Sequence, residues 1–319
     1  MKYVLFIGSR VGFEALDLMT KETCDIIHVF IEKEHEHEYE KLYKKSILIC
    51  EKENLDYSVN SSQKEIRKIL TEKENSDNNL QYIMSFGYRR MIPDSVLNLA
   101  KTAALGTHFS PLPRYRGFAP LNWVLINGEN NTAINLFFLD KEVDNGDIVD
   151  TEIVPISKED DINTLFDKCI ITFKELMRRV IPKLEKGQFE AVKQDKEKAT
   201  YTCARNPDDG LINWNWSSTR IYNLTRALTY PYPGSFSFIN GNKIIIWSCE
   251  EYETPKYDGR IPGKVIKVIS GIGVVVLCGE GAILIKYVQL ENGQKQTADN
   301  VIKSIRLTLG KSDSIGGNR

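Results

Sequence analysis

Residues 103–117 read AALGTHFSPLPRYRG, and this stretch decides how the rest of the chain is interpreted. Its first part is a short apolar run typical of a buried strand, which is expected to end at Phe109, just after His108. The loop that follows contains two prolines, which fix φ, and Gly117, which permits close backbone approach. A second turn, DNGDI at 144–148, offers the histidine a carboxylate partner. Together these features favour a catalytic histidine.

Working outward, the first half of the chain alternates short apolar runs with segments of helical periodicity. This alternation predicts an α/β fold with a Rossmann-like, doubly wound, mostly parallel sheet. In such sheets ligands bind beyond the carboxyl ends of the strands, where His108 and Asp144 are expected. Strands are predicted at 3–8, 25–31, 81–86, 103–109 and 132–139, and helices at 12–20, 63–72, 93–100, 119–127 and 161–186.

The composition changes near residue 200, where a turn cluster at 206–210 introduces β-rich sequence. A short helix at 218–228 is expected to be capped by Ser217 or Ser218. Five short strands then predict an OB-like β-barrel. They are expected at 236–239, 243–247, 264–269, 273–277 and 282–290. The predicted domains are a catalytic domain at 1–203 and an OB-like domain at 204–310, with a linker and short helix at 204–234 and a tail at 311–319.

The bulk composition excludes several classes of protein. The 319 residues are 42% hydrophobic and 27% charged, with a net charge of −1, so no nucleic-acid partner is indicated. No apolar stretch reaches the roughly 18 residues that a membrane span needs, and the N-terminal run is expected to be a strand. The six cysteines form no Cys-x-x-Cys pair, which predicts a reducing cytoplasm, no disulfide framework and no metal site. His35 and His37 lie in the mixed charge run 32–45, interpreted as solvated.

Arginines stand beside the candidate histidine. The guanidinium groups of Arg114 and Arg116 suit a phosphate or a carboxylate, and Arg10 in the first loop is a weaker candidate. A histidine, a carboxylate and a basic loop at one sheet edge suit transfer of an acyl-type group. The group would come from an anionic cofactor or pass to a phosphorylated acceptor.

The motifs resemble a known signature. Residues 108–117, the APLNW that follows at 119–123, and 144–148 are similar to the signature of the 10-formyltetrahydrofolate-dependent formyltransferases. Residues 207–214 and 221–234 are similar to the linker and second domain of that family, in particular the sugar-nucleotide N-formyltransferases. The resemblance covers nearly the whole chain. It implies N10-formyltetrahydrofolate as cosubstrate and a nucleotide-linked amino sugar of a surface-glycan pathway as acceptor.

The resemblance also implies residue roles. His108 would act as general base or proton shuttle, its imidazolium would stabilise an oxyanion, and Asp144 would orient it. The segment at 85–88 is similar to the loop that contacts the folate. The residues expected beside the folate are Phe86, Gly87, Tyr88, Leu139, Asp140, Val143 and Asp144. Those expected beside the acceptor are Arg10, Ser110, Arg114, Tyr115 and Arg116.

One position departs from the family pattern. The family usually has an asparagine two residues before the histidine, where this chain has Gly106. Loss of one oxyanion donor typically costs about 10²–10³ in rate. Water, a backbone N–H or another side chain such as Asn135 could replace the missing donor, or the enzyme could be slower. A formyltetrahydrofolate hydrolase and a non-catalytic folate- or nucleotide-binding relative stay open as alternatives.

The acceptor is the least constrained part of this interpretation. Methionyl-tRNA formyltransferases share the two-domain plan and carry a basic insertion after the second strand. The corresponding stretch here begins EKEHEHEYEKL at residue 32, and tRNA backbone contacts need Lys and Arg. A tRNA acceptor therefore ranks below a sugar nucleotide. Members of the family are often dimers, so the resemblance leaves a homodimer open.

Overall fold

The computed structural model describes residues 1–34, 41–77 and 79–310, without the side chains of 75–77. Contacts within this part of the chain define two compact units, each described by itself here. Unit 1 consists of 1–120, 131–155 and 166–202, and unit 2 of 121–130, 156–165 and the chain from Cys203 onward.

Each unit is therefore made of segments that are separated in the sequence. The stretches 121–130 and 156–165 belong to unit 2, although the sequence prediction placed them in the domain at 1–203. The predicted tail at 311–319 lies outside the described residues. So do His35 and His37.

Unit 1 contains a seven-stranded, mostly parallel sheet, which confirms the predicted fold class. One strand runs opposite to its neighbours, which the sequence did not predict. β7 pairs antiparallel with both of its neighbours, β5 and β8. In spatial order the strands are β3 (Tyr57–Val59), β2 (Asp25–Ile31), β1 (Lys2–Ile7), β4 (Leu80–Phe86), β5 (Ala103–His108), β7 (Asn131–Phe138) and β8 (Ile148–Pro155).

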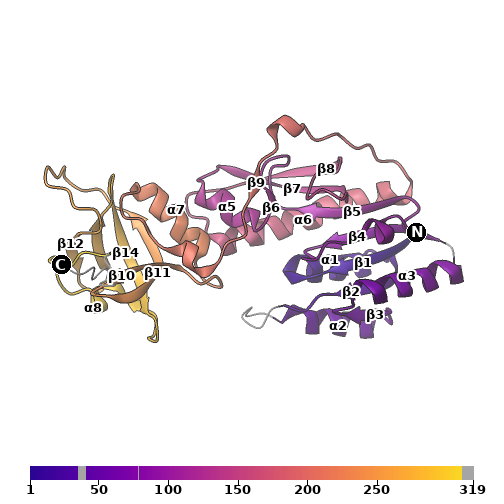
Figure 1. Cartoon of the computed structure of the whole chain (residues 1–319), viewed down its shortest axis with the longest axis horizontal. Helices are drawn as coiled ribbons and strands as arrows, with labels where there is room; N and C mark the ends of the chain where they lie inside the picture. Colours follow the sequence, from indigo (N-terminus) through magenta and orange to yellow (C-terminus); the bar gives the residue numbers. More distant parts are fainter. Residues whose placement is uncertain (35–40, 78, 311–319) are drawn as a thin grey trace, which may run out of the picture. The chain divides into compact units, whose positions relative to one another are not determined.

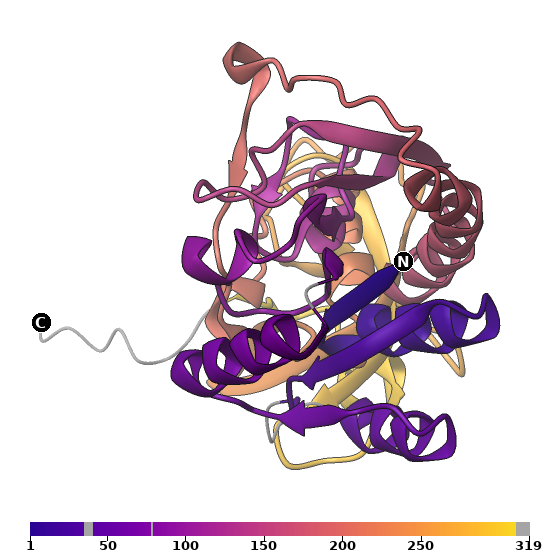
Figure 2. The same ribbon diagram turned by 90° about the vertical axis from the view of Figure 1, so that its right-hand side faces the viewer.

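The central strands of this sheet are buried because helices cover both faces (Figures 1 and 2). On one face α3 and α4 pack against Phe6 and Ile83. On the other, Phe86 contacts Phe173 of α6 edge to face. Strands covered on both sides have continuous apolar sequence, as in β1. The helices within residues 1–202 are α1 (Ser9–Lys21), α2 (Leu42–Lys52), α3 (Gln63–Asp77), α4 (Asp94–Leu97), α5 (Pro120–Ile126) and α6 (Ile162–Glu185), of which α5 lies almost wholly in unit 2.

Among the strands of the seven-stranded sheet and the helices between them, three elements have no counterpart in the sequence prediction. α2 buries only Leu42, Ser46 and Cys50, so its apolar stripe is too narrow to be recognised. β3 has three half-buried residues. β8 is an edge strand that presents carboxylates, two of which pair with Arg179 of α6, so it lacks a buried strand's pattern.

Unit 2 is built on a separate antiparallel sheet of six strands. Its pairings run from β10 to β12 through β11, β14 and β13, and β15 pairs with β14. α7 begins at the predicted cap, where Ser217 Oγ accepts from the backbone N–H of Arg220. The strands are β10 (Ser235–Ile239), β11 (Asn242–Glu251), β12 (Val265–Ile269), β13 (Gly273–Leu277), β14 (Ala282–Leu290) and β15 (Gln296–Thr297), with helices α7 (Ser218–Leu228) and α8 (Ala298–Val301).

None of the helices in the described ranges combines the length and the apolar composition that crossing a bilayer requires.

Candidate active site

His108 is the last residue of β5 and is buried, with 8% of its surface exposed. Its Nε2 lies 2.8 Å from the carbonyl oxygen of Tyr115, and its Nδ1 lies 3.4 Å from Oδ2 of Asp144. Both neighbouring groups are acceptors. A neutral imidazole has only one N–H, so only the imidazolium can donate to both. Whichever ring nitrogen carries the hydrogen, an acceptor lies beside it.

Asp144 reaches His108 by a route that the sequence did not indicate. Because β7 is antiparallel, its end at Phe138 lies beside Leu105 rather than beside His108. The loop after β7 returns along β5 and brings Asp144 back to the histidine. Oδ2 of Asp144 also accepts from the backbone N–H of Gly117 at 2.8 Å. The carboxylate is thus fixed by two groups of the 108–117 segment.

Arg116 holds the loop that carries Asp144 in place through hydrogen bonds. It is 1% exposed, and its Nε and Nη2 donate to Oε1 of Gln194 at 3.2 and 2.7 Å. Its Nη1 donates to Oδ1 of Asn145 at 2.9 Å. Gln194 in turn donates from Nε2 to the backbone oxygens of Asp144 and Gly146. Arg116 is thus buried and holds the Asp144 loop, and its contact with the acceptor stays a prediction.

The other residues expected beside the acceptor lie in different settings. Ser110 is fully buried, and its hydroxyl donates to the carbonyl of Arg114. The exposed guanidinium of Arg114 lies over the ring of Tyr115, 5.1 Å from its centre. Tyr115 has a left-handed φ of 61°, which is uncommon for a non-glycine residue and costs backbone energy. Arg10 is paired with Asp167 at 2.6 Å.

The segment expected beside the folate divides between the two faces of the sheet. The side chain of Phe86 is fully buried on the α6 face. Tyr88 packs edge to face on Phe6, and burial raises the pKa of its phenol to about 12. Gly87 has a φ of 61°, and a Cβ there would lie 2.4 Å from Oγ of Ser9. Only glycine fits this turn.

Leu139 occupies the space beside Gly106. A Cβ at position 106 would lie 2.6 Å from Cδ2 of Leu139. Further along the loop, Asp140 is exposed and its carboxylate accepts from the N–H of Lys141. Val143 is 45% exposed. Leu139 thus faces the sheet, whereas Asp140 and Val143 are exposed.

Asn135 is fully committed to the protein. Its Nδ2 donates to the carbonyls of His108 and Ser110 at 3.1 and 2.5 Å, and its Oδ1 accepts from Thr151 at 2.5 Å. The residue holds the loop start in place and has no amide proton left for a substrate.

Gln194 is a site residue that the sequence prediction missed. It lies in an irregular segment between α6 and the short strand β9 (Tyr201–Thr202), which pairs with β6 (Arg116–Gly117). No motif surrounds it in the sequence. Its role depends on a contact with Arg116 across 78 positions of the chain, which local patterns cannot show.

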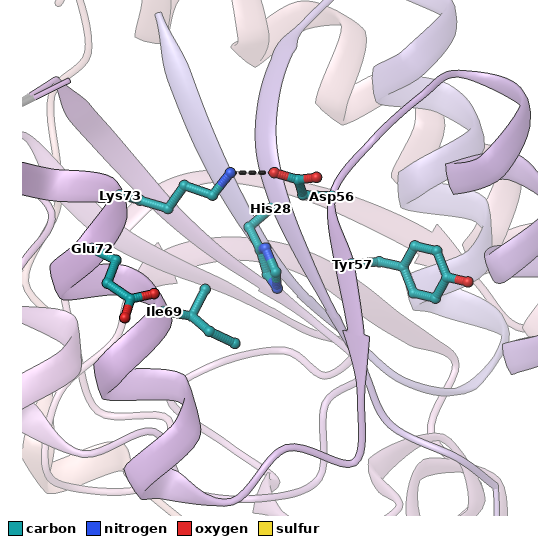
Figure 3. Close-up of a pocket in the computed structure, with 6 residues that line it drawn as sticks. All are labelled: His28, Asp56, Tyr57, Ile69, Glu72 and Lys73. Atoms are coloured by element: carbon teal, nitrogen blue, oxygen red, sulfur yellow. Dashed lines mark hydrogen bonds and ion pairs between the residues drawn. The ribbon is translucent and has the colours of Figure 1, made fainter. Parts of the chain in front are cut away.

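A cavity of unit 1 lies away from these residues, and Figure 3 shows it. It has a volume of about 440 Å³ and lies between α3 and the strands β2 and β3. In Figure 3 His28 lies between the side chains of α3 on one side and the neighbouring residues Asp56 and Tyr57 on the other. None of the predicted site residues lines it. In the part of the chain that the structure covers, no group of three potential metal ligands is found.

Two family models match the chain. The model described as formyl transferase matches residues 2–181, and the model for the formyl transferase C-terminal domain matches 205–306. The chain belongs to the formyl transferase family. This confirms the resemblance to the formyltransferase family that is seen in the sequence.

Solved structures of low identity share the fold of this formyltransferase. The N-formyltransferase from Helicobacter canadensis, in complex with folinic acid and dTDP-3-aminofucose, is 18% identical (TM-score 0.67, 92% of this chain, 99% of that one). Methionyl-tRNA formyltransferase from Clostridium thermocellum is also 18% identical (TM-score 0.53, 81% and 94%). HypX from Aquifex aeolicus, in complex with tetrahydrofolic acid, is 16% identical (TM-score 0.62, 93% and 46%). This chain thus spans just under half the length of HypX.

Proposed function

We propose that this formyltransferase moves the formyl group of N10-formyltetrahydrofolate to the amine of a nucleotide-linked amino sugar. The observation that carries the proposal is the pairing of His108 with both Asp144 and the Tyr115 carbonyl. That environment stabilises the ring once it has accepted a proton, as a base in amine acylation must. The fold shared with a dTDP-3-aminofucose complex, over nearly the full length of both chains, supports the choice of acceptor.

The residues divide the work of the reaction. The amine nitrogen attacks the formyl carbon, the bond from that carbon to N10 breaks, and one proton must move from the amine to N10. His108 carries that proton from the amine to the leaving nitrogen, and Asp144 orients its ring. The amine must attack unprotonated, so we expect activity to rise through neutral pH.

The free thiols agree with a cytoplasmic location, which is part of the same proposal. All six cysteines are free, and five of them are buried. Burial raises the pKa of the Cys24 and Cys50 thiols to about 12, which keeps them protonated.

The test is turnover of 10-formyltetrahydrofolate with and without a panel of UDP-, dTDP- and GDP-linked amino sugars, with mass spectrometry of each sugar. We expect a gain of one formyl group on one of them. Formation of tetrahydrofolate without a formylated sugar would replace this proposal with the hydrolase alternative. Formylation of methionyl-tRNA would replace the acceptor, and folate binding without turnover would indicate the non-catalytic relative.

A further inference from the structure

One row of residues crosses the sheet of unit 1 at the level of the candidate site. The strand register pairs Phe6 with Ser85, Ser85 with Gly106, and Gly106 with Phe137. Neighbouring strands lie about 4.8 Å apart. Ser85 is therefore the next residue beside Gly106 within the sheet.

The hydroxyl of Ser85 is on the same face as the site. Side chains alternate between the faces along a strand, and Ile83, two residues earlier, packs into the cluster with Phe6 and Leu139. Position 106 points to the same face, because a Cβ there would contact Leu139. His108, two residues after Gly106, follows the same alternation. The face thus presents Ser85, the space above Gly106, and the His108 ring.

The chemistry on this face needs a hydrogen-bond donor. When an amine attacks a formyl carbon, negative charge develops on the formyl oxygen, and a prepositioned donor accelerates this step by about 10²–10³. Gly106 has no side chain to supply one. The amide of Asn135 is committed to two carbonyls, and the hydroxyl of Ser110 is committed to Arg114.

Ser85 is different from these residues. Its side chain is half-buried, and within the described residues its hydroxyl makes no hydrogen bond. A hydroxyl can donate as soon as an acceptor arrives. Leu139 fills part of the space at position 106, and Ser85 adjoins that position on the neighbouring strand.

We propose that Ser85 is a catalytic residue that donates its hydroxyl hydrogen to the formyl oxygen as negative charge builds there. The bond strengthens in the tetrahedral state and weakens again when N10 leaves, so Ser85 gains and loses no proton overall. The inference rests on the proposed formyl transfer. It assigns to a side chain on β4 the donor that position 106 on β5 does not provide.

The first test compares two variants that each delete an unpartnered hydroxyl. Ser85→Ala is expected to lower kcat by about 10²-fold, with a much smaller change in the KM for the folate. Ser85→Thr keeps a hydroxyl and should retain most of the activity. The matched control is Thr107→Val, because Oγ1 of Thr107 is buried without a partner in the described region and faces away from His108. Equal kcat values for Ser85→Ala and Thr107→Val would overturn the proposal.

The second test needs no turnover, so it separates this inference from the proposed function. A stable N10-formyl folate analogue with a ¹³C formyl carbon is bound to the wild type and to Ser85→Ala, and its carbonyl stretch is measured by infrared spectroscopy. We expect the stretch to lie at lower frequency in the wild type, because a hydrogen bond weakens the carbonyl. Identical frequencies would reject the role of Ser85 even in an active enzyme. A difference in an enzyme that formylates no sugar would keep the role of Ser85 and reject the acceptor.

Discussion

Two histidines of unit 1 are almost equally buried and have opposite surroundings. His108, at the end of β5, has an acceptor at each ring nitrogen. His28, in the middle of β2, has Oγ of Ser58 at 3.1 Å from Nε2, and within the described residues its buried Nδ1 has no partner. Burial, and then the positive charge of Lys73, lower the pKa of His28 to about 4. Burial and a nearby positive charge thus favour the neutral ring at His28, whereas an acceptor lies beside each ring nitrogen of His108.

The largest expected effect separates the two residues by activity. His108→Ala removes the proton shuttle and should lower kcat/KM for formyl transfer by about 10³-fold, within the usual range for a general base. His28→Ala should change kcat/KM by no more than a few-fold, because His28 lines the separate cavity on β2. Steady-state kinetics on both variants, with folding checked by circular dichroism, measures the difference. Near-normal turnover of His108→Ala would mean that another group moves the proton.

The next effect concerns Arg116, whose hydrogen bonds hold the loop that carries Asp144. Arg116→Met leaves the buried side-chain oxygen of Gln194 and the half-buried one of Asn145 without their donor, and each such orphan costs about 1–3 kcal/mol. We therefore expect the free energy of unfolding to fall by about 4 kcal/mol, measured by urea denaturation. The matched control is Arg114→Met, two positions away and exposed, which should change it by about 0.5 kcal/mol or less. Similar losses in both variants would contradict the bracing role of Arg116.

Local sequence patterns predicted some elements of the fold and not others. β1 and β5 are short apolar runs and α6 has a wide apolar stripe, so local patterns were sufficient to predict all three. The antiparallel course of β7 was not predicted, because an apolar strand carries no mark of its direction. The expectation that Asp144 would lie near His108 assumed a shared strand edge, whereas a returning loop joins them.

The sequence also did not predict which polar side chains are buried. Arg116 and Arg114 are two residues apart in one loop and look alike in sequence. One is enclosed by Gln194 and Asn145, and the other lies on the surface. Residues from distant segments decide which of the two arginines is buried. Only the structure therefore separates an arginine that holds a loop from one that is accessible to a substrate. Ser85 was predicted only as part of the folate loop at 85–88, because its place beside Gly106 depends on strand register.

The smallest effect is the dependence of stability on pH at His28. Its pKa is about 4 in the folded chain and about 6.5 when unfolded, so between these values the unfolded state binds more protons. The stability that the neutral ring contributes is present above pH 6.5 and is lost as the pH falls to 4, by about 3 kcal/mol. Asp56 opposes this shift and Lys73 adds to it, and both stay in place when only the ring is changed.

His28→Phe removes the titrating group next to Phe30, which an aromatic ring can contact in its place. The free energy of unfolding of this variant should therefore fall less than that of the wild type between pH 7 and pH 4. Urea denaturation of both proteins at a series of pH values measures the two slopes, and all other titrating groups cancel in their difference. Equal slopes would mean that the His28 ring is charged at acid pH in the folded protein. The cavity of Figure 3 would then supply the acceptor that Nδ1 lacks, and the contrast with His108 would disappear.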